Sequence, residues 1–347
     1  SVRCGSDKRR TCESLRVGRY TFTCRLEDDC SLPRYKGSMF RGVLGHALRR
    51  VVCPLRANKC GSECGLQSSC LYFRMFEGLS AAAPRPYIIE PPLSTETVFS
   101  TGATFTFNLV LLGDINQFFP HFFYAFYNVG ETGIGKNRSR FTITSVLDDQ
   151  GEVWRRDVGS LLRVRGAFHL PAPQAVVSQG PCEETTALVR LITPLRFKFR
   201  NRFQAELPFD VLIRVVLRRI SSVWLYFAGS EPALDYRGLV HHAARISTLQ
   251  QDLHWVDIKR FSSRQEAEML IGGLQGSVCY RGDFRPFMEL LNLASVLHVG
   301  KQTTFGLGQM SVEYGVNFGE WGGTVSYTHL RAHETPEHLV CRLLLEK

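Results

Sequence analysis

Lysine, methionine, tryptophan and long apolar runs are all scarce in this sequence of 347 residues. Only eight of the 42 basic residues are lysines, so the other 34 are arginines. The most apolar stretch, residues 105–126, is interrupted by Asp114, Asn116 and His121, and it falls short of the roughly 18 apolar residues that a membrane-spanning helix needs. Residues 1–19 are polar and charged and contain no apolar signal segment. We therefore expect a cytoplasmic protein with no membrane partner.

The surplus of positive charge points to an acidic partner. The formal net charge is +10. Arginine pairs with phosphate in a bidentate way and stacks on bases, whereas lysine acts mainly as a point charge. An arginine-rich chain therefore favours a polyanion such as nucleic acid, although a basic protein without such a partner has a similar composition. Hydrophobic residues make up 44% of the chain, enough for two cores, and the length suggests two domains.

The first half of the chain alternates strand and helix patterns. Apolar residues recur at helical spacing in residues 37–52 and, with many aromatic rings, in residues 116–128. The second of these helices leads into a glycine-rich loop at residues 129–140. Strands are predicted at residues 19–26, 87–90, 104–112 and 141–146.

The second half repeats this order. Helices are predicted at residues 208–227, with a proline at the start, and at residues 287–297. A short helix, capped by Ser262 or Ser263, is predicted between the two middle strands. A second glycine-rich loop, residues 299–309, follows the last helix. Strands are predicted at residues 187–199, 254–259, 269–280 and 310–314.

Each half thus has the order β-α-β-β-α-β of a ferredoxin-like, or RRM-like, domain. The duplication predicts an α+β fold of two tandem domains with glycine-rich loops, in which helices cover one face of each sheet and the other face is free to meet RNA. The domains are expected at residues 1–170 and 186–318, with a linker at residues 171–185. Residues 319–347 resemble translated vector sequence, with a C-terminal amphipathic helix as the alternative, and are left out of the functional argument.

A cysteine-rich insertion at residues 53–70 follows the first predicted helix. Its four cysteines are separated by six, three and five residues. Four thiolates in a short loop can form the tetrahedral shell of a structural zinc ion, which would give order to a loop without secondary structure. Paired C-x-x-C knuckles are absent, so reduced cysteines or an iron–sulfur cluster stay open as alternatives. The predicted zinc ligands are Cys53, Cys60, Cys64 and Cys70.

The two glycine-rich loops occupy equivalent places in the two halves. Glycine lets backbone N–H groups approach a phosphate closely, and basic residues stand beside the glycines in both loops. Plain turns are the alternative explanation. The spacing of a nucleotide-hydrolase phosphate loop is not present. The loop residues predicted to contact RNA are Gly133, Gly135, Lys136, Arg138, Gly300, Lys301, Gly306 and Gly308.

A series of strings along the chain resembles the CRISPR-associated RAMP-superfamily endoribonucleases that process precursor CRISPR RNA. The first half contributes LPRYKGSMFRGVLGHALRRVVC, CLYFRMFEG, PRPYIIEPP and GIGKNRSRF. The second half contributes LITPLRFKF, WVDIKRFSSRQ, GGLQGSVCY and HVGKQTTFGLGQ. The resemblance extends over about residues 17 to 316 in the expected order and implies CRISPR repeat RNA as the partner.

The resemblance also implies a chemistry. Members of this family cleave RNA without a catalytic metal, because the ribose 2′-hydroxyl attacks the adjacent phosphate. His46 matches the position of a catalytic histidine in several members, and histidine can act as acid or base near neutral pH. Lys36 or Arg41 is expected to stabilise the phosphorane charge, and Tyr35 to orient the hydroxyl. Arg41 and Arg49 are also expected to bind RNA.

Other interpretations stay open. If His46 only packs or contacts RNA, the chain would be a non-catalytic RNA-binding subunit of a CRISPR effector complex. A third possible function is that of a zinc-stabilised structural protein that does not bind RNA. Arg214, Arg218 and Arg219 either line an RNA groove between the halves or form a solvated helix face. The neighbouring histidines His241 and His242 are expected in a polar connection.

Overall fold

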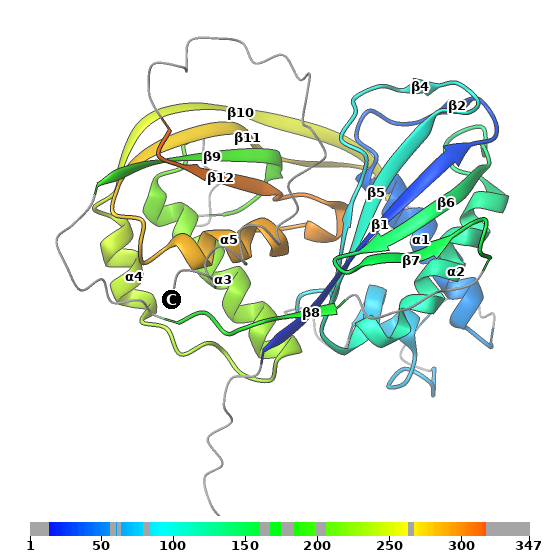
Figure 1. Cartoon of the computed structure of the whole chain (residues 1–347), viewed down its shortest axis with the longest axis horizontal. Coiled ribbons are helices and arrows are strands. Elements are labelled where there is room, and N and C mark those ends of the chain that lie inside the picture. Colours follow the sequence, from blue (N-terminus) through cyan, green and yellow to red (C-terminus); the bar gives the residue numbers. More distant parts are fainter. Residues whose placement is uncertain are drawn as a thin grey trace, which may run out of the picture.

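The computed structural model contains two antiparallel sheets, one in each half of the chain (Figure 1). It describes residues 14–55, 60, 64–78, 83–159, 167–174, 184–198, 206–262 and 267–316. The predicted C-terminal tail and part of the predicted linker lie outside the described residues.

The first sheet has the order β3-β5-β1-β6-β7, and β8 pairs with the start of β1. Helices α1 (Gly37–Val52) and α2 (Phe119–Thr132) cover one face, with a 3-10 segment η2 (Gly113–Phe118) leading into α2. The strands are β1 (Leu15–Leu26), β3 (Tyr87–Glu90), β5 (Thr104–Leu112), β6 (Phe141–Asp148), β7 (Gly151–Arg155) and β8 (Ala167–Leu170), with a separate pair β2 (Cys30–Ser31) and β4 (Val98–Phe99).

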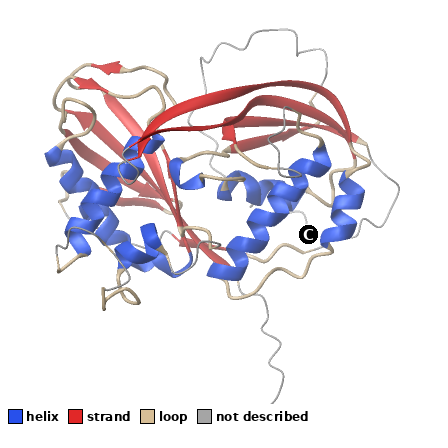
Figure 2. Ribbon diagram, turned by 180° about the vertical axis from the view of Figure 1, so that it is seen from behind, coloured by secondary structure: helices blue, strands red, loops and turns tan. Residues whose placement is uncertain are grey.

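The second sheet has the order β10-β11-β9-β12, which matches β3-β5-β1-β6 of the first sheet when its strands are counted in chain order. Its helices lie on one side of the sheet (Figure 2). The prediction of two tandem ferredoxin-like domains is confirmed. The elements are β9 (Thr185–Leu195), α3 (Phe209–Phe227), α4 (Tyr236–Ala243), β10 (Ser247–Ser262), β11 (Ala267–Gly282), α5 (Met288–Leu297), the 3-10 turn η3 (Thr303–Phe305) and β12 (Met310–Tyr314).

Each half is stabilised by a large buried hydrophobic cluster of its own. In the first half, aromatic rings of the sheet stack against rings of α2, as when Tyr20 and Phe119 approach to 3.9 Å between centroids. In the second half, α3 supplies the fully buried Trp224, and Phe209 packs edge-on against Tyr280 of β11. Burial of such large apolar side chains, about 1.5–3 kcal/mol each, is the main driving force for each half.

Part of the outer face of the first sheet is covered, which the sequence did not predict, while Thr104 and Thr106 of β5 on the same face stay exposed. Val17, Ile88, Val110 and Leu112 are fully buried, and they belong to the core of the second half instead of the first. The C-terminal end of β5 is apolar on both faces, which is typical of a strand covered on both sides. The first sheet therefore packs against the second half through this end of its outer face.

One local prediction lies outside the described residues and another was wrong. β10 continues to Ser262 and pairs with β11 from Ala267, so the short helix predicted between the middle strands would fall on residues 263–266, which the structure does not describe. His241 and His242 do not lie in a polar connection but on α4, where Asp235 caps the helix by accepting a hydrogen bond from the Gly238 amide.

A buried polar contact joins the two halves. The Glu90 carboxylate at the end of β3 accepts from His298 Nε2 at 3.2 Å, and from Arg19 and Asn108 at 2.6 Å each. His298 is fully buried and directly follows α5. Burial alone would raise the pKa of Glu90, but the hydrogen bond from His298 and the charge of Arg19 outweigh it and hold the pKa at about 2.

Both ring nitrogens of His298 face oxygen acceptors. Nδ1 lies 3.1 Å from the Leu307 carbonyl, and Nε2 faces Glu90. These two contacts reach oxygen atoms in different halves of the chain. The Nδ1 contact holds the second glycine-rich loop, and the Nε2 contact holds β3. One imidazole therefore sets the position of this loop against the first half.

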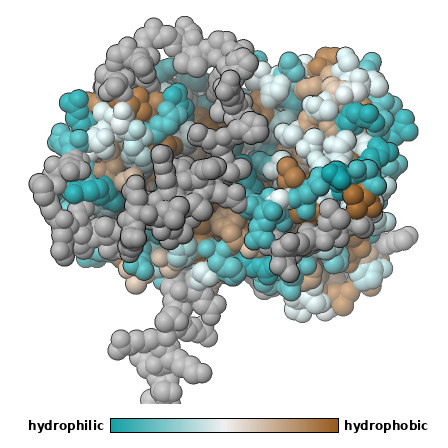
Figure 3. Space-filling model, viewed as in Figure 1, coloured by the Kyte–Doolittle hydropathy of each residue, from teal (hydrophilic) through white to brown (hydrophobic). Residues whose placement is uncertain are grey.

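No described helix is long and apolar enough to span a bilayer. Outside the grey segments of Figure 3, hydrophilic and hydrophobic side chains are interspersed on the face shown.

Replacement of Glu90 by glutamine tests the buried contact between the halves. We expect E90Q to lower the free energy of unfolding by about 3–5 kcal/mol, because it removes the buried carboxylate charge that Arg19, Asn108 and His298 surround. The folded-state pKa lies below the ordinary value of 4.5, so the wild-type advantage is complete above about pH 4.5 and declines as pH falls towards 2. Urea unfolding across this pH range measures it, and equal stability of both proteins at pH 7 would contradict the assignment.

Candidate functional site at the interdomain seam

His46 lies on the solvent face of α1. The opposite face of the helix, which includes Leu44 and Leu48, is buried in the core. His46 itself is exposed, and Arg50, also exposed, stands one turn further along the helix. The structure therefore presents an accessible imidazole beside a cation. The sequence left the face of α1 that His46 occupies open, and the catalytic role of His46 stays a prediction.

Lys36 does not lie where the predicted electrostatic role requires it. Its side chain is fully buried, and Nζ donates to the carbonyls of Ser94 at 2.6 Å and Glu96 at 2.9 Å. Burial lowers the pKa of Lys36, and the Glu96 charge acts in the opposite direction. The ammonium thus ties the segment before β4 to the start of α1, and it does not face solvent.

Tyr35 also makes a structural contact. Its hydroxyl donates to the Phe305 carbonyl at 2.6 Å, across the seam between the halves. Its ring packs against Ile258 and Ile271 of the long hairpin. Burial raises the pKa of Tyr35. The predicted role in orienting a ribose hydroxyl therefore does not fit, since the phenol is used to hold α1 against the second half.

The guanidinium groups of Arg41 and Arg49, two residues of α1, lie near aromatic rings. The Arg41 guanidinium lies 5.3 Å from the ring centre of Phe76 in the short helical turn η1 (Phe73–Glu77). It lies 4.8 Å from that of Phe305, which belongs to the other half. The Arg49 guanidinium lies 5.8 Å from the Tyr72 ring. Arg41 is thus placed at the seam, and its contact with RNA stays a prediction.

The glycines of the second loop serve close packing. Gly306 has φ +83°, and a Cβ there would lie 2.5 Å from the Ile89 carbonyl of the first half. The prediction that the backbone amides of these loops bind phosphate is wrong at four positions, because these N–H groups already donate to carbonyls of the protein. These amides belong to Gly133, Lys301, Gly306 and Gly308.

Two basic side chains of the first loop, Lys136 and Arg138, are exposed, as is Lys301 in the second. Gly135 packs closely against the Ser31 carbonyl, and Gly300 against that of Arg196. The charges of both loops therefore stay available to a ligand, while their glycines are explained by packing.

The four cysteines of the insertion are free and partly exposed. The pKa of Cys60 is raised by burial and by Cys53 and Cys70, while Arg49 lowers it, so these groups lie near one another. Within the described residues, however, no three His, Cys, Asp or Glu side chains are arranged to hold a metal ion. Residues 56–59 and 61–63 lie outside the description. Zinc stays a prediction.

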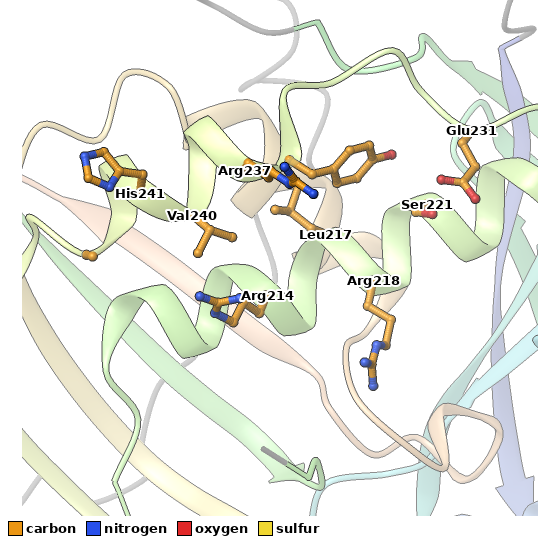
Figure 4. Close-up of a pocket in the computed structure, with 10 residues that line it drawn as sticks. Arg214, Leu217, Arg218, Ser221, Glu231, Arg237, Val240 and His241 are labelled. Atoms are coloured by element: carbon orange, nitrogen blue, oxygen red, sulfur yellow. The ribbon is translucent and has the colours of Figure 1, made fainter. Parts of the chain in front are cut away.

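A separate cavity lies between α3 and α4 (Figure 4). Arg214 and Arg218 line it from α3, and Arg237 and His241 from α4, over a volume of about 670 Å³. These arginines therefore do not line the seam. Arg219 is buried and donates to the Leu297 and His298 carbonyls, so it fixes the end of α5.

Sequence reasoning missed the contribution of the second half to the seam. The Arg260 guanidinium on β10 lies 4.7 Å from the Phe305 ring centre, and Glu90 pairs with His298. All four residues stand in strings that resemble the family. Their contacts join positions far apart in the chain, so no local pattern could indicate them.

Two family models match the chain in succession. A model described as an N-terminal domain matches residues 15–165, and the model of the CRISPR-associated endoribonuclease Cas6 matches residues 189–310. An uncharacterized protein of Archaeoglobus fulgidus is 28% identical over 123 residues, which are 34% of this chain and 41% of that protein.

Solved structures share the fold. A chain of a partial Cas6-RT-Cas1–Cas2 complex superposes with a TM-score of 0.57 at 15% identity, over 94% of this chain and 49% of that one. A Thermus thermophilus Cas6 in a product complex gives 0.51 at 16% identity, over 86% and 100%. The chain thus spans about half the length of the first of these and less than half of the archaeal relative. The resemblance to CRISPR-associated RAMP proteins is confirmed.

Substitution of Lys36 by methionine separates the two roles of this residue. We expect K36M to lower the free energy of unfolding by about 1–3 kcal/mol, because two buried carbonyls lose their donor. Thermal unfolding measures this loss, with K301M, a change of an exposed lysine, as the matched control. Unchanged stability together with a roughly 100-fold slower RNA cleavage would instead return Lys36 to the chemistry.

Proposed function

We propose that this chain, which is a CRISPR-associated RAMP protein of the repeat-processing type, is an endoribonuclease that cleaves CRISPR repeat RNA. The observation that carries the proposal is the exposed imidazole of His46 on α1. The excess of arginine over lysine supports RNA as the substrate, because guanidinium groups pair with phosphate in a bidentate way.

The proposed reaction is a transesterification. The 2′-oxygen of one ribose attacks the adjacent phosphorus, the bond from phosphorus to the 5′-oxygen breaks, and the products carry a 2′,3′-cyclic phosphate and a 5′-hydroxyl. One proton leaves the 2′-hydroxyl and one reaches the 5′-oxygen. His46 would carry one of these protons, because an imidazole changes charge near neutral pH.

Charge on the phosphorane needs cations near the imidazole. Arg50 is exposed and lies one helical turn after His46, and Arg49 directly precedes Arg50 in the same turn of α1. Lys36 is left out of this role because its ammonium is buried on backbone carbonyls. The proposed chemistry thus uses side chains of one helix, α1, whose inner face is fixed by the core.

A non-catalytic RNA-binding subunit is the competing function. Such a subunit would share the fold and the basic surface, so fold and charge do not separate the two. The exposure of His46 argues against a purely packing role, because such a histidine would lie on the buried face of α1, and it is compatible both with catalysis and with an RNA contact. Assembly with other CRISPR proteins is compatible with both functions.

Replacement of His46 by alanine tests the enzyme. We expect H46A to slow cleavage of the repeat RNA by about 10²–10⁴-fold, the usual loss for a general acid or base, while the affinity for RNA changes little. The assay is single-turnover cleavage in chelator with analysis of the RNA ends. H242A, which removes an exposed histidine of α4, is the matched control and should cleave normally.

Two results would contradict the proposal. Wild-type protein that binds the repeat RNA tightly but never cuts it, with or without divalent metal, would support the non-catalytic subunit. Cleavage by H46A at the wild-type rate would move the acid or base to another residue.

A further inference from the structure

Two arginines from different halves meet at one aromatic ring. The guanidinium carbons of Arg41, on α1, and Arg260, on β10, lie 4.8 Å and 4.7 Å from the centre of the Phe305 ring. Phe305 is buried in η3, and its carbonyl accepts the hydrogen bond from Tyr35. The ring therefore cannot move away from either guanidinium, and it brings two positive charges together at the seam.

These charges have no counter-ion within the described part of the chain. Neither guanidinium forms an ion pair with a described carboxylate, and Arg260 Nη2 contacts only the Met269 sulfur, at 3.4 Å. The Nε atoms of Arg41 and Arg260 are both buried without a hydrogen-bond partner. The Tyr87 hydroxyl is also buried close to Arg41. Buried donors without acceptors are rare in folded proteins and call for an explanation.

The two cations also act on each other. The pKa of Arg260 is lowered, first by burial and then by the charge of Arg41. Like charges held together in a partly buried place cost stability, unless an anion joins them. The arrangement is therefore explained if its normal state includes a bound anion.

We propose that Arg41 and Arg260 form a clamp for one phosphate group of the RNA strand, bridging the two halves. The identity of the ligand rests on the proposed function. Guanidinium forks suit the oxygens of a phosphodiester, and a pair from two domains can hold one phosphate from two sides. An acidic peptide is the alternative source of an anion, but the RNA strand already supplies phosphates at this surface.

The clamped phosphate is not the one that reacts, so binding replaces the phosphorane role that the sequence suggested for Arg41. Arg41 precedes His46 by five residues, which places it about 7.5 Å away along the helix axis and about 140° around it. The clamp therefore acts in binding and in the register of the strand. Its loss should weaken affinity and leave the rate at saturating RNA nearly unchanged.

The test compares R41M and R260M with R218M, a matched change of an exposed arginine on α3. Three quantities are measured on the full chain: the unfolding temperature without ligand, the affinity for repeat RNA with a 2′-deoxy group at the cleaved position, and the single-turnover rate at saturating RNA. We expect R41M and R260M to unfold no earlier than the wild type, to bind roughly 10- to 100-fold more weakly, and to cleave at nearly the wild-type rate.

An R260M protein that unfolds earlier but binds RNA normally would overturn the clamp, because Arg260 would then be a structural partner of Phe305. Inorganic sulfate separates this failure from that of the proposed function. If the wild type does not bind repeat RNA but sulfate raises its unfolding temperature more than that of R260M, the anion clamp holds and the proposed substrate is wrong. If neither RNA nor sulfate distinguishes the wild type from R260M, the clamp is wrong.

Discussion

The buried contact between Glu90 and His298 is the constraint on which the arrangement of the two halves depends. It joins the last residue of β3 to the first residue after α5, and it lies in an interior where an unpaired charge would be costly. His298 also holds the Leu307 carbonyl, so the second glycine-rich loop cannot shift without breaking a buried bond. The loop then presents Phe305 to α1.

Helix α1 links this constraint to function. Its inner face fills the first core, and the residue before its capping lysine, Tyr35, contacts the second half through Phe305. Its outer face carries His46 into solvent. One helix therefore connects a rigid interface with an accessible imidazole. We infer that the seam sets the position of RNA, while α1 supplies the reacting group.

Local patterns in the sequence were sufficient to predict most elements and the duplicated order. The helix at residues 37–52 has the predicted bounds because its apolar residues recur at helical spacing and form a single buried face. The strand at residues 104–112 also has the predicted bounds, but its two-sided burial was not recognised as an interface between the halves. A run of apolar residues indicates that a strand is buried on both faces, but only the tertiary structure shows which element covers each face.

The roles of polar side chains were harder to predict. Lys36 looked like a free cation, yet its ammonium is used by two backbone carbonyls about 60 residues away in the chain. The glycines of the second loop looked like a phosphate cradle, yet Gly306 permits close packing against Ile89. Arg260 had no local signal at all. Such contacts depend on tertiary structure, which spacing along a sequence does not encode.

The central claim is that RNA lies across the seam between α1 and the end of the β10–β11 hairpin. Photo-cross-linking of repeat RNA that carries 4-thiouridine, followed by mass spectrometry of the modified peptides, tests it most directly. We predict cross-links in peptides from residues 37–52 and 254–260. Cross-links confined to the cavity between α3 and α4, with none on α1, would contradict the account.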